Sequence, residues 1–324
     1  MIKASAALAA VLVATCMTHA AELNDGRQTE ELVVQTTIPR SGFSLGFAFD
    51  ALWMMSDGQL VKVNAADNSV VDIALPSGEG SGLLADIDRY RGIATGEGAV
   101  WVPDMASSNI YKVDPHANQV VLTIPTDIFG SKGSIGIGAG SVWAITFDDH
   151  NKTLTRYSAT TSAVEAQVRL PRPSAGVLFD FGSVWVTAAN AGELYRIDPS
   201  TNQIAATIGI HDASHILGSA EDSIWVAFDT EGIVQRIDAR TGEVVATIET
   251  GVTDMESDGD IAAGNGFVWI ITRGSILSRI DPATNATKGA YAPPPGTVMG
   301  RRIRTGAGSL WVSGSSIFRI ALPQ

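Results

Sequence analysis

The stretch DFGSVWVTAANAGELYRIDPSTNQIAATIGI, residues 180–210, contains most of a unit that recurs along the chain. It begins with small residues and an aliphatic residue before Trp185, and continues with alternating apolar and polar residues around Arg196. The turn sequence DPSTN (198–202) and a β-rich run, IAATIGI, complete it. Alternation with a period of two is typical of a β-strand, and Asp, Pro and Asn each favour tight turns. The stretch therefore predicts short strands joined by tight turns.

All seven tryptophans of the chain belong to such units, at positions 53, 101, 143, 185, 225, 269 and 311. A further short strand precedes each tryptophan, as in GSIGIG (133–138) and GDIAAG (259–264). Four short strands in about 42 residues match one blade of a β-propeller. The sequence thus predicts an all-β, seven-bladed β-propeller. A helical solenoid is excluded because no unit has a 3.6-residue period over ten or more residues.

The two ends of the repeat predict how the ring closes. The seventh unit has only three strands, whereas ELVVQTTIP (31–39) matches a fourth strand and has no tryptophan unit before it. We therefore expect residues 31–38 to supply the outer strand of blade 7, which would remove an open seam. On this interpretation residues 31–324 form one propeller domain, and residues 21–30 are a flexible leader.

The first twenty residues have the pattern of an export signal. Lys3 precedes an apolar stretch from Ala4 to Met17, and Thr18 to Ala20 offer small residues for cleavage after Ala20. The chain's single cysteine, Cys16, lies in this segment, so the mature protein has no thiol and no disulfide; lipidation of Cys16 is the alternative. No later stretch approaches the ~18 apolar residues of a transmembrane helix. We expect a periplasmic or secreted bacterial protein.

The charge of the chain restricts its partners. It has 34 acidic and 22 basic side chains, a net charge of -12, with 45% hydrophobic residues. A nucleic-acid binder needs a basic face, and anionic membranes attract basic segments, so both partners are disfavoured. We expect a monomer whose partner is a small molecule, a peptide or a protein.

The motif GxGSVW followed by RIDPxTNxVxATI resembles bacterial seven-bladed propellers of the YVTN and virginiamycin B lyase-like group. The resemblance covers about residues 31–321 and implies the fold. The lyases of this group open a cyclic depsipeptide by elimination, with Mg²⁺ and with His and Glu side chains. Their repeat tends to place Thr-Glu shortly after Trp-Phe, whereas no unit here has Glu there: Trp101 is followed by Val-Pro-Asp, for example.

Propellers generally carry their function at one end of the central channel. The loops from each fourth strand to the next first strand share that end with the loops between second and third strands. Varied polar residues interrupt the repeat in both sets of loops, so we predict a ligand site there. First-strand candidates are Ser44, Arg91, Ser134, Ser174, His215, Asp260 and Arg302; loop candidates are Asp57, Asp104, Asp148, Asp149, His150, Asn190, Asp229 and Arg273.

Three groups of residues in this rim are candidates for catalysis, metal binding or anion binding. His215 is the candidate for acid–base catalysis, since its ordinary pKa lies near neutrality; the alternative is a histidine bonded to a loop carbonyl. Asp258 and Asp260 belong to an acidic run that could hold Mg²⁺ or Ca²⁺, or that is simply solvated. Arg302, with Arg301 and Arg304, could bind a carboxylate or phosphate, or pair with the acidic run of blade 6.

Two functional hypotheses follow. The leading one is an exported propeller that binds its partner at the channel rim without turnover. The alternative is a metal-assisted lyase or lactone hydrolase, with a divalent ion on carboxylates such as Asp104, Asp229 or Asp260 and His215 as the base. Elsewhere we expect the tryptophans to pack between blades, and the repeated Lys or Arg, such as Arg196, to pair with neighbouring carboxylates.

Overall fold

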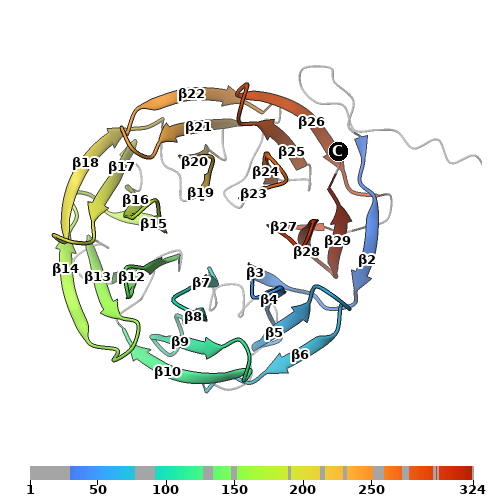
Figure 1. Cartoon of the computed structure of the whole chain (residues 1–324), viewed down its shortest axis with the longest axis horizontal. Helices are drawn as coiled ribbons and strands as arrows, with labels where there is room; N and C mark the ends of the chain where they lie inside the picture. Colours follow the sequence, from blue (N-terminus) through green and yellow to red (C-terminus); the bar gives the residue numbers. More distant parts are fainter. Residues whose placement is uncertain are drawn as a thin grey trace, which may run out of the picture.

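The computed structural model of the 324-residue chain describes residues 30–76, 92–126, 134–146, 152–188, 191–211, 216–228, 232–250, 259–271, 277–294, 297 and 299–322. Within these residues every helix-or-strand element is a strand, and the strands form seven sheets arranged in a ring (Figure 1). The predicted seven-bladed β-propeller is confirmed.

Each blade contains four antiparallel strands that lie side by side from the centre outward, and in blades 1 to 6 these four follow one another in the sequence. Blade 1 consists of β3 (Phe43–Ala48), β4 (Ala51–Ser56), β5 (Gln59–Asn64) and β6 (Val70–Ile73). Blade 2 consists of β7 (Ala94–Gly96), β8 (Ala99–Asp104), β9 (Asn109–Asp114) and β10 (Gln119–Pro125). Blade 3 consists of β11 (Ile135–Gly138), β12 (Ser141–Thr146), β13 (Thr153–Ser158) and β14 (Val164–Arg169). Blade 4 consists of β15 (Ser174–Asp180), β16 (Ser183–Ala188), β17 (Glu193–Asp198) and β18 (Gln203–Gly209). Blade 5 consists of β19 (Ile216–Ala220), β20 (Ser223–Phe228), β21 (Ile233–Asp238) and β22 (Val244–Glu249). Blade 6 contains β23 (Asp260–Gly264), β24 (Phe267–Ile271), β25 (Leu277–Asp281) and β26 (Ala286–Ala292).

Blade 7 combines both ends of the repeat. It contains β27 (Met299–Gly306), β28 (Ser309–Gly314) and β29 (Ile317–Ala321), and its outer strand is β2 (Val34–Ile38), antiparallel to β29. The predicted closure of the ring by the leading segment is therefore confirmed. One detail of the prediction is wrong: Glu31 does not belong to blade 7, because β1 (Glu30–Glu31) pairs in parallel with β26 and makes blade 6 five-stranded. The leading segment thus spans the seam between blades 6 and 7.

The tryptophans occupy equivalent positions on the second strands, and all seven side chains are fully buried. Each indole Nε1 donates a hydrogen bond to the carbonyl oxygen five residues earlier, as Trp185 does to Asp180 at 3.1 Å. In between lies a two-residue turn with both φ angles positive, such as 55° at Ala139 and 69° at Gly140. Such turns match the twist of a hairpin and explain the recurring glycine. Trp53 packs against Val100 and other blade 2 residues, so the predicted packing between blades is confirmed.

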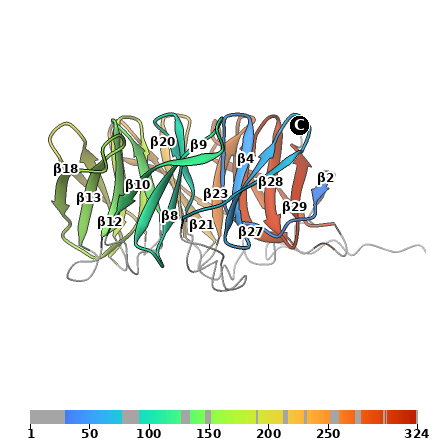
Figure 2. The ribbon, with the colours of Figure 1, turned by 90° about the horizontal axis from the view of Figure 1, so that it is seen from below.

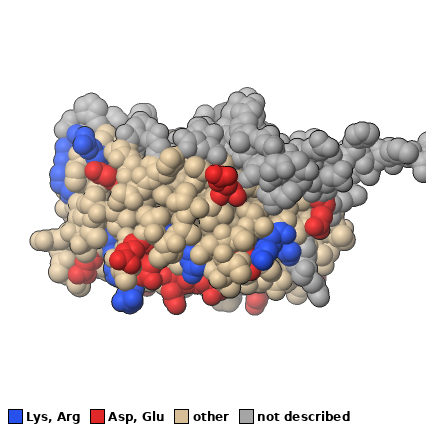
Figure 3. Space-filling view, turned by 90° about the horizontal axis from the view of Figure 1, so that it is seen from above, with Lys and Arg blue, Asp and Glu red and all other residues tan. Residues whose placement is uncertain are grey.

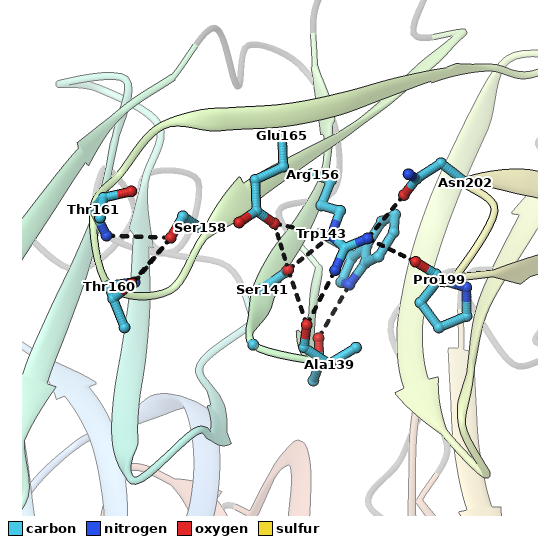
Figure 4. A network of polar contacts seen from close by, with 12 residues as sticks. Ala139, Ser141, Trp143, Arg156, Ser158, Thr160, Thr161, Glu165, Pro199 and Asn202 are labelled. Atoms are coloured by element: carbon cyan, nitrogen blue, oxygen red, sulfur yellow. Dashed lines mark hydrogen bonds and ion pairs between the residues drawn. The ribbon is translucent and has the colours of Figure 1, made fainter.

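The basic residue of the third strand connects each blade to the next, as Arg156 of blade 3 shows (Figure 4). Its guanidinium lies 4.9 Å from the Trp143 ring centre, and its Nη1 donates to the Pro199 carbonyl at 2.6 Å and to Asn202 Oδ1 at 3.0 Å. Both acceptors belong to the turn between the third and fourth strands of blade 4. We call this contact between a basic side chain and the next blade's turn the latch.

The latch corrects the expectation that these basic residues pair with carboxylates. Their acceptors in the next blade are neutral turn oxygens: backbone carbonyls and, in four latches, also the side-chain oxygen of an asparagine. Arg156 alone combines the latch with an ion pair, to Glu165 of its own blade at 3.0 Å, among the contacts that the structure describes for the latch residues. The other latches are Lys62 to Pro115, Lys112 to Ala159, Arg196 to Arg240, Arg236 to Pro282 and Arg319 to Ala65.

The seam between blades 6 and 7 is built differently. Blade 7 has no turn between its third and fourth strands, since those strands come from opposite ends of the repeat. Arg279 of blade 6 instead lies 4.4 Å from the ring centre of Phe267, and 5.9 and 5.8 Å from those of Trp269 and Tyr291. Leu32, which lies between β1 and β2 in the sequence and is only 3% exposed, belongs to the same apolar cluster as Trp269 and Tyr291. The leading segment therefore supplies contacts across this seam.

Candidate ligand site in the central channel

The centre of the ring contains a cavity of about 370 Å³, lined by the first-strand region of every blade. The strands run roughly along the ring axis (Figure 2), so the two ends of a first strand lie at opposite ends of the channel. Residues that begin first strands line this cavity, among them Ser44, Ser134 and Asp260. The cavity therefore includes the end of the channel where we predicted the ligand site and extends along the first strands.

Four of the predicted first-strand residues line this cavity: Ser44, Ser134, Asp260 and Arg302. Ser134 also joins blades 3 and 4, because its Oγ accepts from the Val177 N–H at 2.6 Å and donates to the Val177 carbonyl at 3.0 Å. Ser174 is not part of the lining; it is buried and its Oγ donates to the Arg172 carbonyl at 3.1 Å. The structure thus unites part of the predicted first-strand set.

Asp104 occupies a different environment from the one expected of a rim ligand. Its side chain is 1% exposed and is not in the cavity lining. One carboxylate oxygen accepts from the Ala106 N–H at 3.0 Å and the other from Ser107 Oγ at 2.7 Å. The carboxylate therefore stabilises the turn between β8 and β9. Asp57, in the corresponding turn of blade 1, is exposed.

The remaining predicted residues lie outside the described residues and stay predictions. They are the catalytic candidate His215, the ligand-binding candidates Arg91, Asp148, Asn190, Asp229 and Arg273, the metal candidate Asp258, and the loop residues Asp149 and His150.

The described charges of the cavity lie together on blades 6 and 7. Arg304 Nη1 donates to Asp260 Oδ2 at 2.7 Å, and the two side chains are 28% and 14% exposed. Asp260 also accepts from the backbone N–H groups of Ile261 and Ile303, both at 3.0 Å. Arg302 Nη1 donates to the Gly259 carbonyl at 3.0 Å. Arg304 therefore pairs with an acidic residue of blade 6, as one of the two alternatives predicted, whereas the side-chain bond of Arg302 just described goes to a backbone carbonyl of blade 6.

Asp260 was predicted as a metal ligand together with Asp258. In the structure its two oxygens receive the three donors just described. Among the described residues there is no group of three or more His, Cys, Asp or Glu side chains that could hold a metal ion.

A second cavity of about 280 Å³ continues from the first. The two share Phe47, Leu178, Leu217 and Arg304. The second is also lined by residues near the ends of first strands, such as Ala220 and Thr305. The channel thus contains two chambers that share three apolar residues and one arginine.

The repeat contains a signal for Arg304 that our choice of ligand-binding residues did not use. Arg304 stands seven residues before its tryptophan, Trp311. The equivalent residues of the other units are small or apolar: Gly46, Ala94, Gly136, Leu178, Gly218 and Ala262. A charged residue at a position that otherwise faces tightly packed neighbours indicates a specialised role.

The opposite end of the ring is acidic. Acidic side chains gather along this edge, at the bottom of the view in Figure 3. Glu97 Oε1 accepts from the Gly140 N–H at 2.9 Å and so joins the turns of blades 2 and 3. Exposed acidic residues of the described turns between first and second strands or third and fourth strands are Asp50, Asp67, Glu97, Glu221, Asp222 and Glu243.

Comparisons with known proteins show the fold alone. The chain is similar to the WD40 β-propeller domain of Doa1, with 12% identity and a TM-score of 0.66 over 90% of this chain and 97% of that one. It is also similar to a chain in the structure of the mitotic checkpoint complex, with 10% identity and a TM-score of 0.70 over 99% and 98%. No protein-family model and no curated protein matches the chain. Among the described residues, no helix is long and apolar enough to span a membrane.

Proposed function

We propose that the protein is an exported binding module whose central channel, at the end where the first strands begin, holds a small molecule or part of a peptide or protein partner. The observation that carries this proposal is the cavity of about 370 Å³ lined by all seven blades. Small-molecule sites are concave, mostly apolar and carry a few polar groups, and this lining has that composition. Propeller domains commonly bind partners, which supports the same role.

The described polar groups of the cavity favour recognition. Ser134 and Asp260 are held by hydrogen bonds to backbone groups of neighbouring blades, so their orientations are fixed before a ligand arrives. Fixed polar groups lower the entropy lost on binding. This preorganisation supports a binding role for the cavity.

Filling the channel tests the proposal. Leu217 lines both chambers, so Leu217→Trp should obstruct them, whereas Val164→Trp adds the same bulk on an exposed outer strand. Mature wild-type protein and both variants are dialysed against pooled organic acids, amines, neutral compounds and short peptides, and retained compounds are identified by mass spectrometry. We expect retention by the wild type and Val164→Trp, and loss with Leu217→Trp. Equal retention by all three folded proteins, or none by the wild type, would contradict the proposal.

Export is tested by expressing the chain with its own leader in a Gram-negative host. We expect the protein in the periplasm with Ala21 as its first residue, since residues 1–20 have the pattern of a signal. An intact leader in the cytoplasm would overturn this part of the proposal, and lipid on Cys16 would replace secretion by anchoring.

A further inference from the structure

We infer that the channel ligand is a small organic monocarboxylate: Arg304 binds its carboxylate, and Phe47, Leu178 and Leu217 contact its apolar part. This inference rests on the proposed function, because it names the ligand class of the same channel.

The guanidinium of Arg304 carries the argument. Its Nη1 donates to Asp260 Oδ2 and to the Ile303 carbonyl. In the described part of the chain, these two are the hydrogen bonds of this side chain. Within the part of the chain that the structure describes, the edge formed by Nε and Nη2 therefore has no protein acceptor, although the side chain is only 28% exposed. A guanidinium edge with two parallel N–H groups matches the two oxygens of a carboxylate.

Asp260 acts as a positioning residue for this guanidinium. Its carboxylate is held by the N–H groups of Ile261 and Ile303, and it fixes Arg304 at the junction of the two chambers. A flexible arginine would lose side-chain entropy on binding, whereas one already held loses less. The ion pair therefore prepares Arg304 to receive an anion.

The surroundings of Arg304 specify the rest of the ligand. Phe47, Leu178 and Leu217 belong to blades 1, 4 and 5, and like Arg304 they line both chambers. A ligand seated at the junction would meet these apolar side chains together with the guanidinium. The chambers, about 370 and 280 Å³, are near the lower end of the size range of small-molecule sites, which favours a small ligand.

The charge balance favours one negative charge on the ligand. Asp260 lies 2.7 Å from Arg304, so a doubly charged phosphate at the same guanidinium would be repelled by this carboxylate. The described charged residues of the lining are Asp260, Arg302 and Arg304, whose formal charges sum to +1. A single carboxylate matches that sum.

A set of apolar carboxylic acids of increasing size, such as butyrate, hexanoate, benzoate and 4-phenylbutyrate, tests the inference. Each acid is compared with its primary amide by ligand-observed NMR and calorimetry on the mature protein. We expect at least one acid to bind at millimolar concentration or below, and to bind about tenfold or more tightly than its amide. Inorganic phosphate should compete poorly.

Variants locate the binding. Arg304→Gln should weaken the acid about tenfold or more, and Arg240→Gln, on an exposed turn at the other end, should not. The double variant Asp260→Asn with Arg304→Gln should behave like Arg304→Gln and guards against misfolding caused by an unpaired Asp260. Thermal unfolding checks that each variant is folded.

The inference fails if no acid binds, if the amides bind as well as the acids, or if folded Arg304→Gln retains full affinity. If the wild-type protein retains compounds other than carboxylic acids, and Leu217→Trp abolishes that retention, the proposed function stands but the ligand class is overturned. If the wild-type protein retains no compound at all, both the proposed function and the ligand class are overturned.

Discussion

Replacing Arg156 by alanine removes one latch and shows how much the contacts between blades stabilise the ring. Arg156 Nε donates to Ser141 Oγ at 2.8 Å, and Nη2 donates to the Ala139 carbonyl at 3.1 Å. Together with the bonds to Pro199 and Asn202, these contacts join two blades through one side chain. Arg156→Ala deletes them all and leaves their acceptors to find water.

The magnitude follows from these contacts. A hydrogen bond from a charged group contributes about 1.5–3 kcal/mol, and a cation–π contact about 0.5–2 kcal/mol. These values do not add, because the bonds share one side chain. Water partly compensates the loss of the ion pair, since Glu165 is 37% exposed. We expect the free energy of unfolding to fall by about 3 kcal/mol.

Urea unfolding followed by tryptophan fluorescence measures this loss, with Arg240→Ala as the matched control on an exposed turn. The control should stay within about 0.5 kcal/mol of the wild type. Arg156→Lys should lose only about 1–2 kcal/mol, because Lys62 and Lys112 make the latch with one ammonium group, at 2.6 and 2.8 Å. If Arg156→Ala is as stable as Arg240→Ala, the latch does not stabilise the ring and the reasoning is refuted.

Three further predictions concern other parts of the fold. Leu32→Ala should lower the unfolding free energy by about 2–5 kcal/mol, since Leu32 is buried across the seam of blades 6 and 7. Gly138→Ala should lower it by about 1–3 kcal/mol, because a Cβ there would lie 2.1 Å from the Phe179 ring. Hydrogen bonds, first that from the Ala283 N–H, hold the pKa of Asp281 below its usual value. This carboxylate therefore contributes stability above its unfolded pKa of about 3.9, which should be lost as the pH falls through the lower folded value.

Matched variants check these three predictions by urea unfolding. Val33→Ala, at an exposed neighbour of Leu32, should be nearly neutral. Gly209→Ala should also have little effect, because nothing lies within 4 Å of the added Cβ. Asp281→Asn should show a shallower fall of stability below about pH 4 than the wild type. A variant that behaved like its control, or an unchanged acid slope, would contradict the corresponding prediction.

The fold was predictable because its determinants are local. The glycine-containing turn, the tryptophan five residues after the carbonyl it binds, and the DPxTN turn all act within one hairpin, so the sequence displays them directly. The role of the basic residues was mispredicted for the opposite reason. Their acceptors in the next blade are neutral turn oxygens, backbone carbonyls and in four latches also an asparagine side chain, and the sequence does not show which of these contacts form between blades.

The channel site was predictable only in part. Register placed Ser44, Ser134, Asp260 and Arg302 at the starts of first strands, and they do line one cavity. The importance of Arg304 depends on which edge of its guanidinium Asp260 occupies, and only coordinates show such a geometry. The division of the leading segment between β1 and β2 likewise depends on pairing with β26, which lies about 260 residues away in the chain.

The shared blade has a consequence for protein synthesis. β2 leaves the ribosome before the inner strands of every blade, but its partner β29 is the last strand of the ring to be made. During translation the nascent chain can build its early sheets but cannot complete the circle. Loop-closure entropy must be overcome before this pairing forms, so it is expected late in folding. Until then β2 is an exposed edge available to another chain, and a holdase that covers residues 34–38 would protect the newly made protein from aggregation.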